Sequence, residues 1–372
     1  MRSRSVFLIL FACGSATVAA THARAADHSQ PRATWNATGA KDYLDRRMDW
    51  WLHWPTSQRD HSTTCVSCHT VVPFALARPN LRAELAEPGP FHAEALMLES
   101  VSRRVHGWRD MEAFYPDQTR GLPKTSESRG TESVLNALIL SRRDVESGEL
   151  SRDTRLAFAN MWALQFRAGD LKGAWAWLNF HNEPWEANGS PYLGAALAAL
   201  AVGGAPGGYA AAPEIQDGLV SLRDYLRRNV DTTHLLNRAM ALWASGADTA
   251  LFTPAQRKTI VDALAAVQRN DGGWSMATLG PWKRSDATPI DTVSDGYATG
   301  LVTLALIRGR VPHDDSRVVR GLEWLRAHQD SATGMWRASS LNKSRDPSSD
   351  IGKFMSDAAT AYAVLALTEG RK

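Results

Sequence analysis

Cysteine is scarce in this chain of 372 residues, which contains only three: Cys13, Cys65 and Cys68. So few thiols cannot form a disulfide framework for a chain of this length, which excludes the disulfide-stapled class. A strong charge excess is also missing, since the formal net charge of +3 is too small to indicate a nucleic-acid-binding surface. Hydrophobic residues make up 44% and charged residues 22%, which excludes a disordered or collagen-like chain.

Long apolar runs are lacking as well. The apolar stretch at 6–12 is far shorter than the roughly 20 residues that cross a bilayer, and no later segment predicts a transmembrane helix. Arginines precede this stretch and Ala23-Arg24-Ala25 follows it, which is the order of a secretory signal peptide. We therefore expect residues 1–25 to be removed and residues 26–372 to form one secreted or periplasmic domain without net charge.

A lipid-modified Cys13 is the alternative reading of this segment. Leu10-Phe11-Ala12-Cys13 loosely matches a lipobox, but the bulky Phe11 disfavours it.

The two later cysteines stand in Cys65-Val66-Ser67-Cys68-His69, the attachment pattern of c-type haem. Two thiols at this spacing can bond the two vinyl groups of one porphyrin, and the adjacent His69 can ligate the iron. With His61 nearby, Cys65, Cys68 and His69 could instead form a four-ligand zinc site. In an oxidising compartment the two cysteines could also form a disulfide. We expect haem c, with zinc and the disulfide as alternatives.

The rest of the chain predicts α-helices throughout, because strand alternation is scarce and Ala, Leu and Arg dominate periodic stretches. The helices group into six hairpins, and the second helix of most pairs is rich in Ala and Gly. Such helices can crowd together inside a closed ring, so we predict an all-α fold, an (α/α)6 toroid, with an open solenoid as the alternative. The expected pairs are 40–54 with 70–86, 90–106 with 128–141, 151–168 with 190–202, 214–229 with 232–245, 254–269 with 294–308, and 315–328 with 356–368.

Three of the hairpins repeat one pattern within residues 160–368. An outer helix ends in Gln, a loop holds Trp, and an inner helix opens with Ser. The matched positions are Gln165, Trp175 and Ser190; Gln268, Trp274 and Ser294; Gln329, Trp336 and Ser356. The repeats account for part of an unusual excess of Trp, 14 against 7 Tyr. In the first hairpin the C-x-x-C-H segment, 61–70, stands where a Trp would be.

The run Gln268-Arg269-Asn270-Asp271-Gly272-Gly273-Trp274 resembles the QW repeat of squalene–hopene cyclases and their relatives. The resemblance covers residues 150–372 and is poor in the N-terminal third. It implies an (α/α)6 barrel like those of terpenoid cyclases and protein prenyltransferases. It also implies that the Gln and Trp of each repeat clamp helix ends, a structural role that suits a buried Trp with one partner for its N–H.

The cyclases of that family protonate an alkene with a D-x-D-D cluster, in which neighbouring carboxylates keep one acid protonated. This chain offers Asp286, Asp291 and Asp295, which are five and four residues apart, so the compact cluster is absent. Asp295 and Asp357 fit carboxylates at helix starts, which the helix dipole stabilises. Catalysis by Asp286, Asp291 or Asp295 stays an alternative.

In such a toroid the loops from first to second helix share one rim, and here they are long: 55–69, 107–127, 169–189, 270–293 and 329–355. Long loops in a compact domain are typical of functional segments. We expect them to bring the C-x-x-C-H motif together with rim and cavity residues, namely Glu183, Trp185, Trp282 and Tyr297. Other rim residues are His181, Glu186, Asp346 and Asp350. Candidates for a sixth iron ligand are His106, Met111, Met276 and Met335.

These features favour an exported redox protein or haem enzyme. It would hold one c-type haem at the mouth of the toroid, bind an isoprenoid or lipid-like molecule in an apolar central cavity, and meet an electron-transfer partner. The alternatives are a terpenoid cyclase without haem and a zinc-dependent toroid enzyme, in which Cys65, Cys68 and a His activate a thiolate or water.

Overall fold

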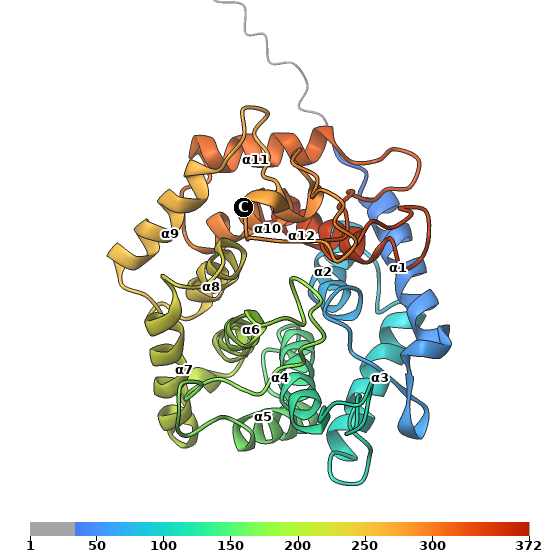
Figure 1. Cartoon of the computed structure of the whole chain (residues 1–372), viewed down its shortest axis with the longest axis vertical. Helices are drawn as coiled ribbons and strands as arrows, with labels where there is room; N and C mark the ends of the chain where they lie inside the picture. Colours follow the sequence, from blue (N-terminus) through green and yellow to red (C-terminus); the bar gives the residue numbers. More distant parts are fainter. Residues whose placement is uncertain (1–33, 372) are drawn as a thin grey trace, which may run out of the picture. The chain divides into compact units, whose positions relative to one another are not determined.

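Twelve α-helices alternate between two concentric layers in residues 34–371, the part of the chain that this computed structural model describes. Figure 1 shows the second helix of each hairpin inside a ring formed by the first. The outer helices are α1 (Ala37–His53), α3 (His92–His106), α5 (Arg152–Ala163), α7 (Gln216–Asn229), α9 (Pro254–Ala266) and α11 (Ser316–Ala327). The inner helices are α2 (Val71–Glu84), α4 (Thr125–Asp144), α6 (Ser190–Gly204), α8 (Leu235–Ala247), α10 (Gly296–Arg308) and α12 (Phe354–Glu369).

The inner helices form a closed ring. Each packs against the next, and α12 packs against both α2 and α1, so the last hairpin meets the first. This confirms the predicted (α/α)6 toroid of six hairpins rather than the open solenoid. The predicted signal peptide and Cys13 lie outside the described residues. No helix within residues 34–371 is long and apolar enough to cross a bilayer.

Small side chains let the inner helices crowd together. Helix α6 consists almost entirely of Ala, Gly, Leu and Val, and most of its residues are buried. A helix that is apolar on all sides is typical of a protein interior. At Gly300 on α10, an added Cβ would lie 2.8 Å from the backbone nitrogen of Ala363 on α12. The outer helices carry the polar faces, and several begin at a capping side chain, such as Thr253 before α9.

Short elements fill the loops between the helices. Strand β1 (Gln58–Arg59) pairs antiparallel with β2 (Thr63–Thr64), with Gln58 opposite Thr64. The 3-10 turns are η1 (Pro55–Ser57), η2 (Asp60–Ser62), η3 (Tyr209–Ala211), η4 (Pro213–Ile215) and η5 (Met276–Thr278).

The repeat glutamines lie just beyond the outer helices, rather than at their last residues as predicted. Helix α9 ends at Ala266, and the amide nitrogen of Gln268 then donates to the carbonyls of Gly272, 2.8 Å away, and Arg317, 3.0 Å away. A glutamine in the last helical turn would point along the helix, whereas this position lets its amide join its own loop to the next outer helix. Gln165 makes the same pair of bonds, to Gly173 and Gly218.

The third glutamine closes the ring. Gln329 donates to the carbonyls of Gly334 and Asn36, and its side-chain oxygen accepts from the Asn36 backbone N–H at 2.7 Å. Asn36 caps α1, so the last repeat holds the start of the first outer helix. The repeat tryptophans are fully buried and donate to carbonyls at the ends of the outer helices: Trp175 to Met161, Trp274 to Leu264 and Trp336 to Leu325. These contacts show the clamp that the resemblance implies.

Gly334→Ala is expected to destabilise this closure. Gly334 has a φ of +80°, and an added Cβ would lie 2.1 Å from the carbonyl oxygen of Gly39. Gly169→Ala is the matched control, because Gly169 has a φ of +75° but no atom within 4 Å of the added carbon. Both variants incur the cost of a left-handed backbone. Urea unfolding should show an additional loss of about 1–3 kcal/mol for Gly334→Ala. Equal losses would show that the close approach is unimportant.

Candidate functional site

The two cysteines and His69 of the C-x-x-C-H motif line one cavity, which we call the cysteine cavity. It lies at the mouth where the inner helices begin, and its volume is about 210 Å³. Its walls come from the end of α1, the loops before α4 and α6, and the start of α12. Aromatic side chains dominate these walls: Trp51, Trp54, Phe114, Tyr115, Phe180, Trp185 and Phe354.

The motif is held rigidly between β2 and α2. The Cys65 backbone N–H donates to the Ser57 carbonyl at 2.8 Å, and the Cys65 carbonyl accepts from the Trp51 indole at 2.8 Å. Ser67, inside the motif, accepts from the backbone N–H of Val71 at 3.1 Å and so caps the first turn of α2. The local sequence therefore turns both thiols and the imidazole toward the same space.

Both thiols are buried and are not joined in a disulfide in this structure. Burial raises the pKa of Cys65 to about 11, and burial also raises the pKa of Cys68 well above its usual value. Thiols in such surroundings are poor nucleophiles at neutral pH, because the thiolate is the reactive form.

A hydrogen-bond chain fixes the orientation of His69. The Thr70 hydroxyl donates to the Asp357 carboxylate at 2.7 Å, and its oxygen lies 2.9 Å from Nδ1 of His69. Since the single hydroxyl proton is used toward Asp357, Nδ1 must donate and Nε2 carries the free lone pair. Burial lowers the pKa of His69 to about 3, with a further contribution from Arg47, so the ring is neutral. Neutral imidazole with a fixed tautomer is the form that ligates a metal.

Helix α1 supplies the other partners of Asp357. Its carboxylate accepts from Arg47 at 2.8 and 3.1 Å and from the Tyr43 hydroxyl at 2.8 Å. Burial alone would lower the pKa of Arg47, but Asp357 and Asp350 raise it. The predicted helix-start carboxylate Asp357 does lie in the first turn of α12, and in addition it serves this network. Tyr43 and Arg47 are four residues apart on one helix face, a spacing that could have drawn attention to them.

Polar side chains interrupt the aromatic walls at a few places. Arg59, Arg120 and Arg345 line the cavity, and the buried Nε of Arg59 has no hydrogen-bond partner. Glu186 also lines it, and burial raises the pKa of its carboxyl, which has the Asn182 amide as a hydrogen-bond partner at 3.4 Å. The arginines can bind the acidic groups of a ligand whose apolar surface packs against the aromatic walls.

The predicted rim residues Trp185 and Tyr297 lead from this cavity into the barrel. Trp185 lines the cavity and lies 5.5 Å from the His69 ring, and its indole donates to the Tyr297 hydroxyl at 3.2 Å. The ring contacts continue from Tyr297 to Tyr362 at 5.2 Å and from Tyr362 to Trp243 at 6.2 Å. This aromatic column fills the interior between the cysteine cavity and a second cavity at Trp243. The expected single central cavity is therefore divided in two.

The other predicted rim residues support the loops. Glu183 is half-buried, and its backbone exchanges two hydrogen bonds with the Asn342 side chain at 2.7 and 2.8 Å. The Asn342 carbonyl also accepts from Ser285, so three loops meet at this residue. Trp282 is buried against His234 and donates to the Met276 carbonyl, and it does not line the cysteine cavity.

The three candidate acids lie in the loop before α10, away from the cysteines. Asp286 is exposed and accepts from the Thr288 side chain and from the Ser344 backbone. Asp291 is exposed and lies 3.5 Å from the Arg284 guanidinium. Asp295 caps α10, with one carboxylate oxygen accepting from Ala298 and the other from Met276. Asp291 and Asp295 share a separate cavity of about 270 Å³. Their contacts fit loop and helix-cap roles.

The pH dependence of stability can test the state of Asp295. Burial raises the pKa of Asp295 to about 6, although backbone hydrogen bonds partly offset it. A proton held more tightly in the folded state contributes stability that is lost as the pH rises from about 4 to about 6. Asp295→Asn keeps a capping residue but cannot titrate. The fall in the free energy of unfolding between pH 4 and pH 6 should therefore be smaller in this variant than in the wild type, by up to about 3 kcal/mol. The measurement is urea unfolding at several pH values.

Asp315→Asn is the control for this prediction. Asp315 also caps a helix, but its hydrogen bond with Arg317 lowers its pKa, so its replacement should change stability by a constant amount between pH 4 and 6. If Asp295→Asn behaved in the same way, the buried acid would already be ionised at pH 4.

Of the four residues of the zinc alternative, His61 lies apart from the other three. His61 is exposed at the tip of the β1–β2 hairpin and pairs with Asp60 at 2.8 Å, whereas Cys65, Cys68 and His69 face the cavity. Within residues 34–371, no three His, Cys, Asp or Glu side chains are grouped to hold a metal ion.

The candidates for a sixth iron ligand also lie elsewhere. His106 is exposed and pairs with Asp153 at 2.8 Å, and Met111 lies against Gly107. Met276 and Met335 line the cavity of Asp295. Met355 at the start of α12 does line the cysteine cavity. Met355 is the last residue of the predicted rim loop 329–355, so the loop pattern alone could have added it to these candidates; the structure places it in the first turn of α12.

Solved structures of a mannanase share this fold at low sequence identity. The α-1,6-mannanase GH76A from Salegentibacter sp. HEL1_6 is similar over 90% of this chain and 98% of its own, with 11% identity and a TM-score of 0.52. An inactive, doubly aspartate-substituted variant of that mannanase, in complex with α-1,6-mannotriose, is similar over 89% of this chain and 98% of its own. The sequence identity is 10% and the TM-score is 0.54. The alignment with the ent-copalyl diphosphate synthase from Streptomyces platensis covers 82% of this chain and 51% of that protein, with 19% identity and a TM-score of 0.47. No model of a known protein family and no curated protein matches this chain.

Proposed function

We propose that this protein is an exported redox protein that carries one c-type haem in the cysteine cavity. The observation that carries the proposal is the common orientation of Cys65, Cys68 and His69, with Nε2 of His69 left free by the bond from Nδ1 to Thr70. Cys65 and Cys68 would hold the macrocycle through thioethers, and His69 would ligate the iron. A bound haem supplies one-electron chemistry.

The surrounding side chains support this assignment. The aromatic walls suit the apolar face of a porphyrin, and Arg59, Arg120 and Arg345 suit its two carboxylate side chains. The partnerless Nε of Arg59 marks a buried donor that such a carboxylate can satisfy. Met355, which lines the same cavity, would offer a thioether as a further iron ligand. The present volume of about 210 Å³ is below that of usual ligand pockets, so side chains of the mouth would move to admit a macrocycle.

The test is expression in a host that attaches c-type haem to exported proteins. We expect one haem per chain that remains bound after denaturation, and none in the Cys65→Ala/Cys68→Ala variant. The mature N-terminus should begin at Ala26 if residues 1–25 are the signal peptide. An unmodified chain, produced beside a correctly matured control cytochrome, would overturn the proposal. Metal analysis of the same sample would then identify zinc if the alternative holds.

A further inference from the structure

A second cavity, which we call the arginine cavity, lies at the opposite mouth of the toroid. It is lined by the C-terminal halves of the six inner helices and has a volume of about 310 Å³. This volume is at the lower end of the range for ligand pockets, which suits a small molecule. The aromatic column ends here at Trp243, so the arginine cavity is separated from the cysteine cavity.

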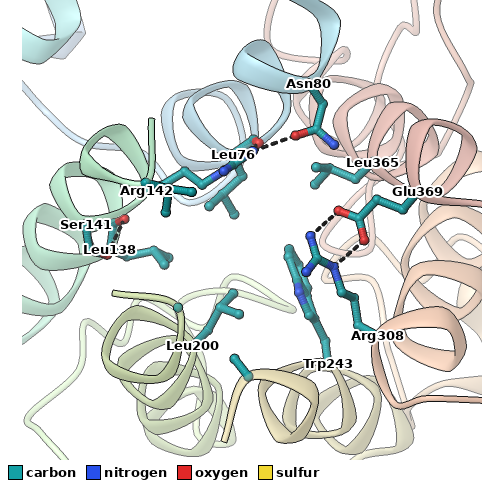
Figure 2. Close-up of a pocket in the computed structure, with 13 residues that line it drawn as sticks. Leu76, Asn80, Leu138, Ser141, Arg142, Leu200, Trp243, Arg308, Leu365 and Glu369 are labelled. Carbon is teal, nitrogen blue, oxygen red and sulfur yellow. Dashed lines mark hydrogen bonds and ion pairs between the residues drawn. The ribbon is translucent and has the colours of Figure 1, made fainter. Parts of the chain in front are cut away.

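The walls of the arginine cavity are apolar. Leu76, Leu138, Leu200 and Leu365 come from four different inner helices, and Trp243 comes from a fifth. Figure 2 shows these side chains converging on the opening. Such walls favour a hydrocarbon over a sugar or another strongly hydrated ligand.

Two arginines give the cavity its charge. Arg308 pairs with Glu369 across α10 and α12, which neutralises it (Figure 2). Arg142 has neutral partners instead, the side-chain oxygen of Asn80 at 2.5 Å and the carbonyl of Leu76 at 3.5 Å. The Arg142 side chain is partly buried, and burial lowers its pKa; Arg308 lowers the pKa further, whereas Glu369 and Glu146 raise it from a distance. Together, the ionised side chains of Arg142, Arg308 and Glu369 carry a net positive charge.

A partly buried guanidinium without a carboxylate in hydrogen-bond contact carries a cost, because its charge has lost some of its water and gained only neutral acceptors. The ends of α4 and α10 offset part of this cost through their dipoles, which favour cations. An anionic group in the cavity would supply the missing partner, and the planar guanidinium can hold a carboxylate through two hydrogen bonds.

We propose that the arginine cavity binds a small amphiphilic carboxylate, with its head group on Arg142 and its hydrocarbon chain among the leucines and Trp243. This inference goes beyond the redox function and does not depend on haem. The ligand would enter at the mouth opposite the C-x-x-C-H motif.

Calorimetry with octanoate, octanol and acetate tests the proposal. Octanoate should bind at one saturable site, octanol at least about tenfold more weakly, and acetate should show no binding, because both the charge and the chain are required. Arg142→Gln should weaken octanoate binding by about tenfold or more and leave octanol binding unchanged.

Arg143→Gln is the matched control. Arg143 is the next residue on α4, but it pairs with Asp144 at 2.9 Å and does not line the arginine cavity. Its replacement should leave octanoate binding unchanged. Melting curves of both variants would establish that they are folded. Equal octanoate affinity for wild type and Arg142→Gln, or no saturable binding to the wild type, would overturn the proposal.

Discussion

Replacing Asp357 with alanine is expected to lower the free energy of unfolding by about 3–5 kcal/mol, since it removes one member of a buried ion pair. Arg47 would keep Asp350, whose side chain is 49% exposed, but would lose two hydrogen bonds from its guanidinium. Tyr43 and Thr70 would lose their acceptor as well. Buried donors without acceptors are the main reason for the expected loss.

The measurement is urea unfolding of the wild type and the Asp357→Ala variant. Asp262→Ala is the control, because Asp262 pairs with Lys258 at 2.6 Å on the surface, where both side chains are more than half exposed. Its removal should cost less than about 1 kcal/mol. Arg47→Met and the double variant complete a mutant cycle, which should give a coupling energy of about 0.5–3 kcal/mol. Additive losses would contradict the proposed ion pair.

The same variant reaches the candidate site through Thr70. Without Asp357, the Thr70 hydroxyl has no carboxylate to donate to, so Nδ1 of His69 can also act as an acceptor. The tautomer that leaves Nε2 free would then no longer be fixed. Asp357 is therefore a positioning residue in the proposed haem site: two hydrogen bonds link it, through Thr70, to Nδ1 of His69, while Nε2 of the same ring would ligate iron.

The fold could be predicted because its signals are local. Small residues on alternate helices indicate an inner ring, and the Gln and Trp positions recur in three of the hairpins, so neither signal requires knowledge of distant contacts. The proximity of Cys65, Cys68 and His69 is also local, because all three stand within five consecutive residues between β2 and α2. The polar network could not be predicted in this way. Arg47 and Asp357 are 310 positions apart and meet only because the ring closes.

The same limitation explains the division of the central cavity. Tyr297 and Tyr362 come from different inner helices, and no pattern along either helix shows that their rings meet. Arg142 lies near the end of α4, and only the meeting of the inner helices places it in a cavity. Trp282 is predicted at the cavity because its loop is long, but the length of a loop does not determine the path that the loop follows. The structure places Trp282 outside the cysteine cavity.

Trp336→Ala tests the closure of the ring and should cost about 3–5 kcal/mol, the usual loss for a large aromatic side chain removed from a core. Trp336 is fully buried, its indole donates to the Leu325 carbonyl at 2.8 Å, and its ring lies 6.1 Å from Trp35. Trp336→Phe should cost less, because it keeps most of the apolar contact and loses chiefly the hydrogen bond. Trp108→Ala is the control at a partly exposed site, where Arg129 lies over the ring.

Because Trp336 joins the last hairpin to the segment before α1, its loss should also increase hydrogen exchange in both α1 and α12. A protected α1 in a destabilised Trp336→Ala variant would show that the first and last hairpins are stable independently, and that the ring does not unfold from this joint.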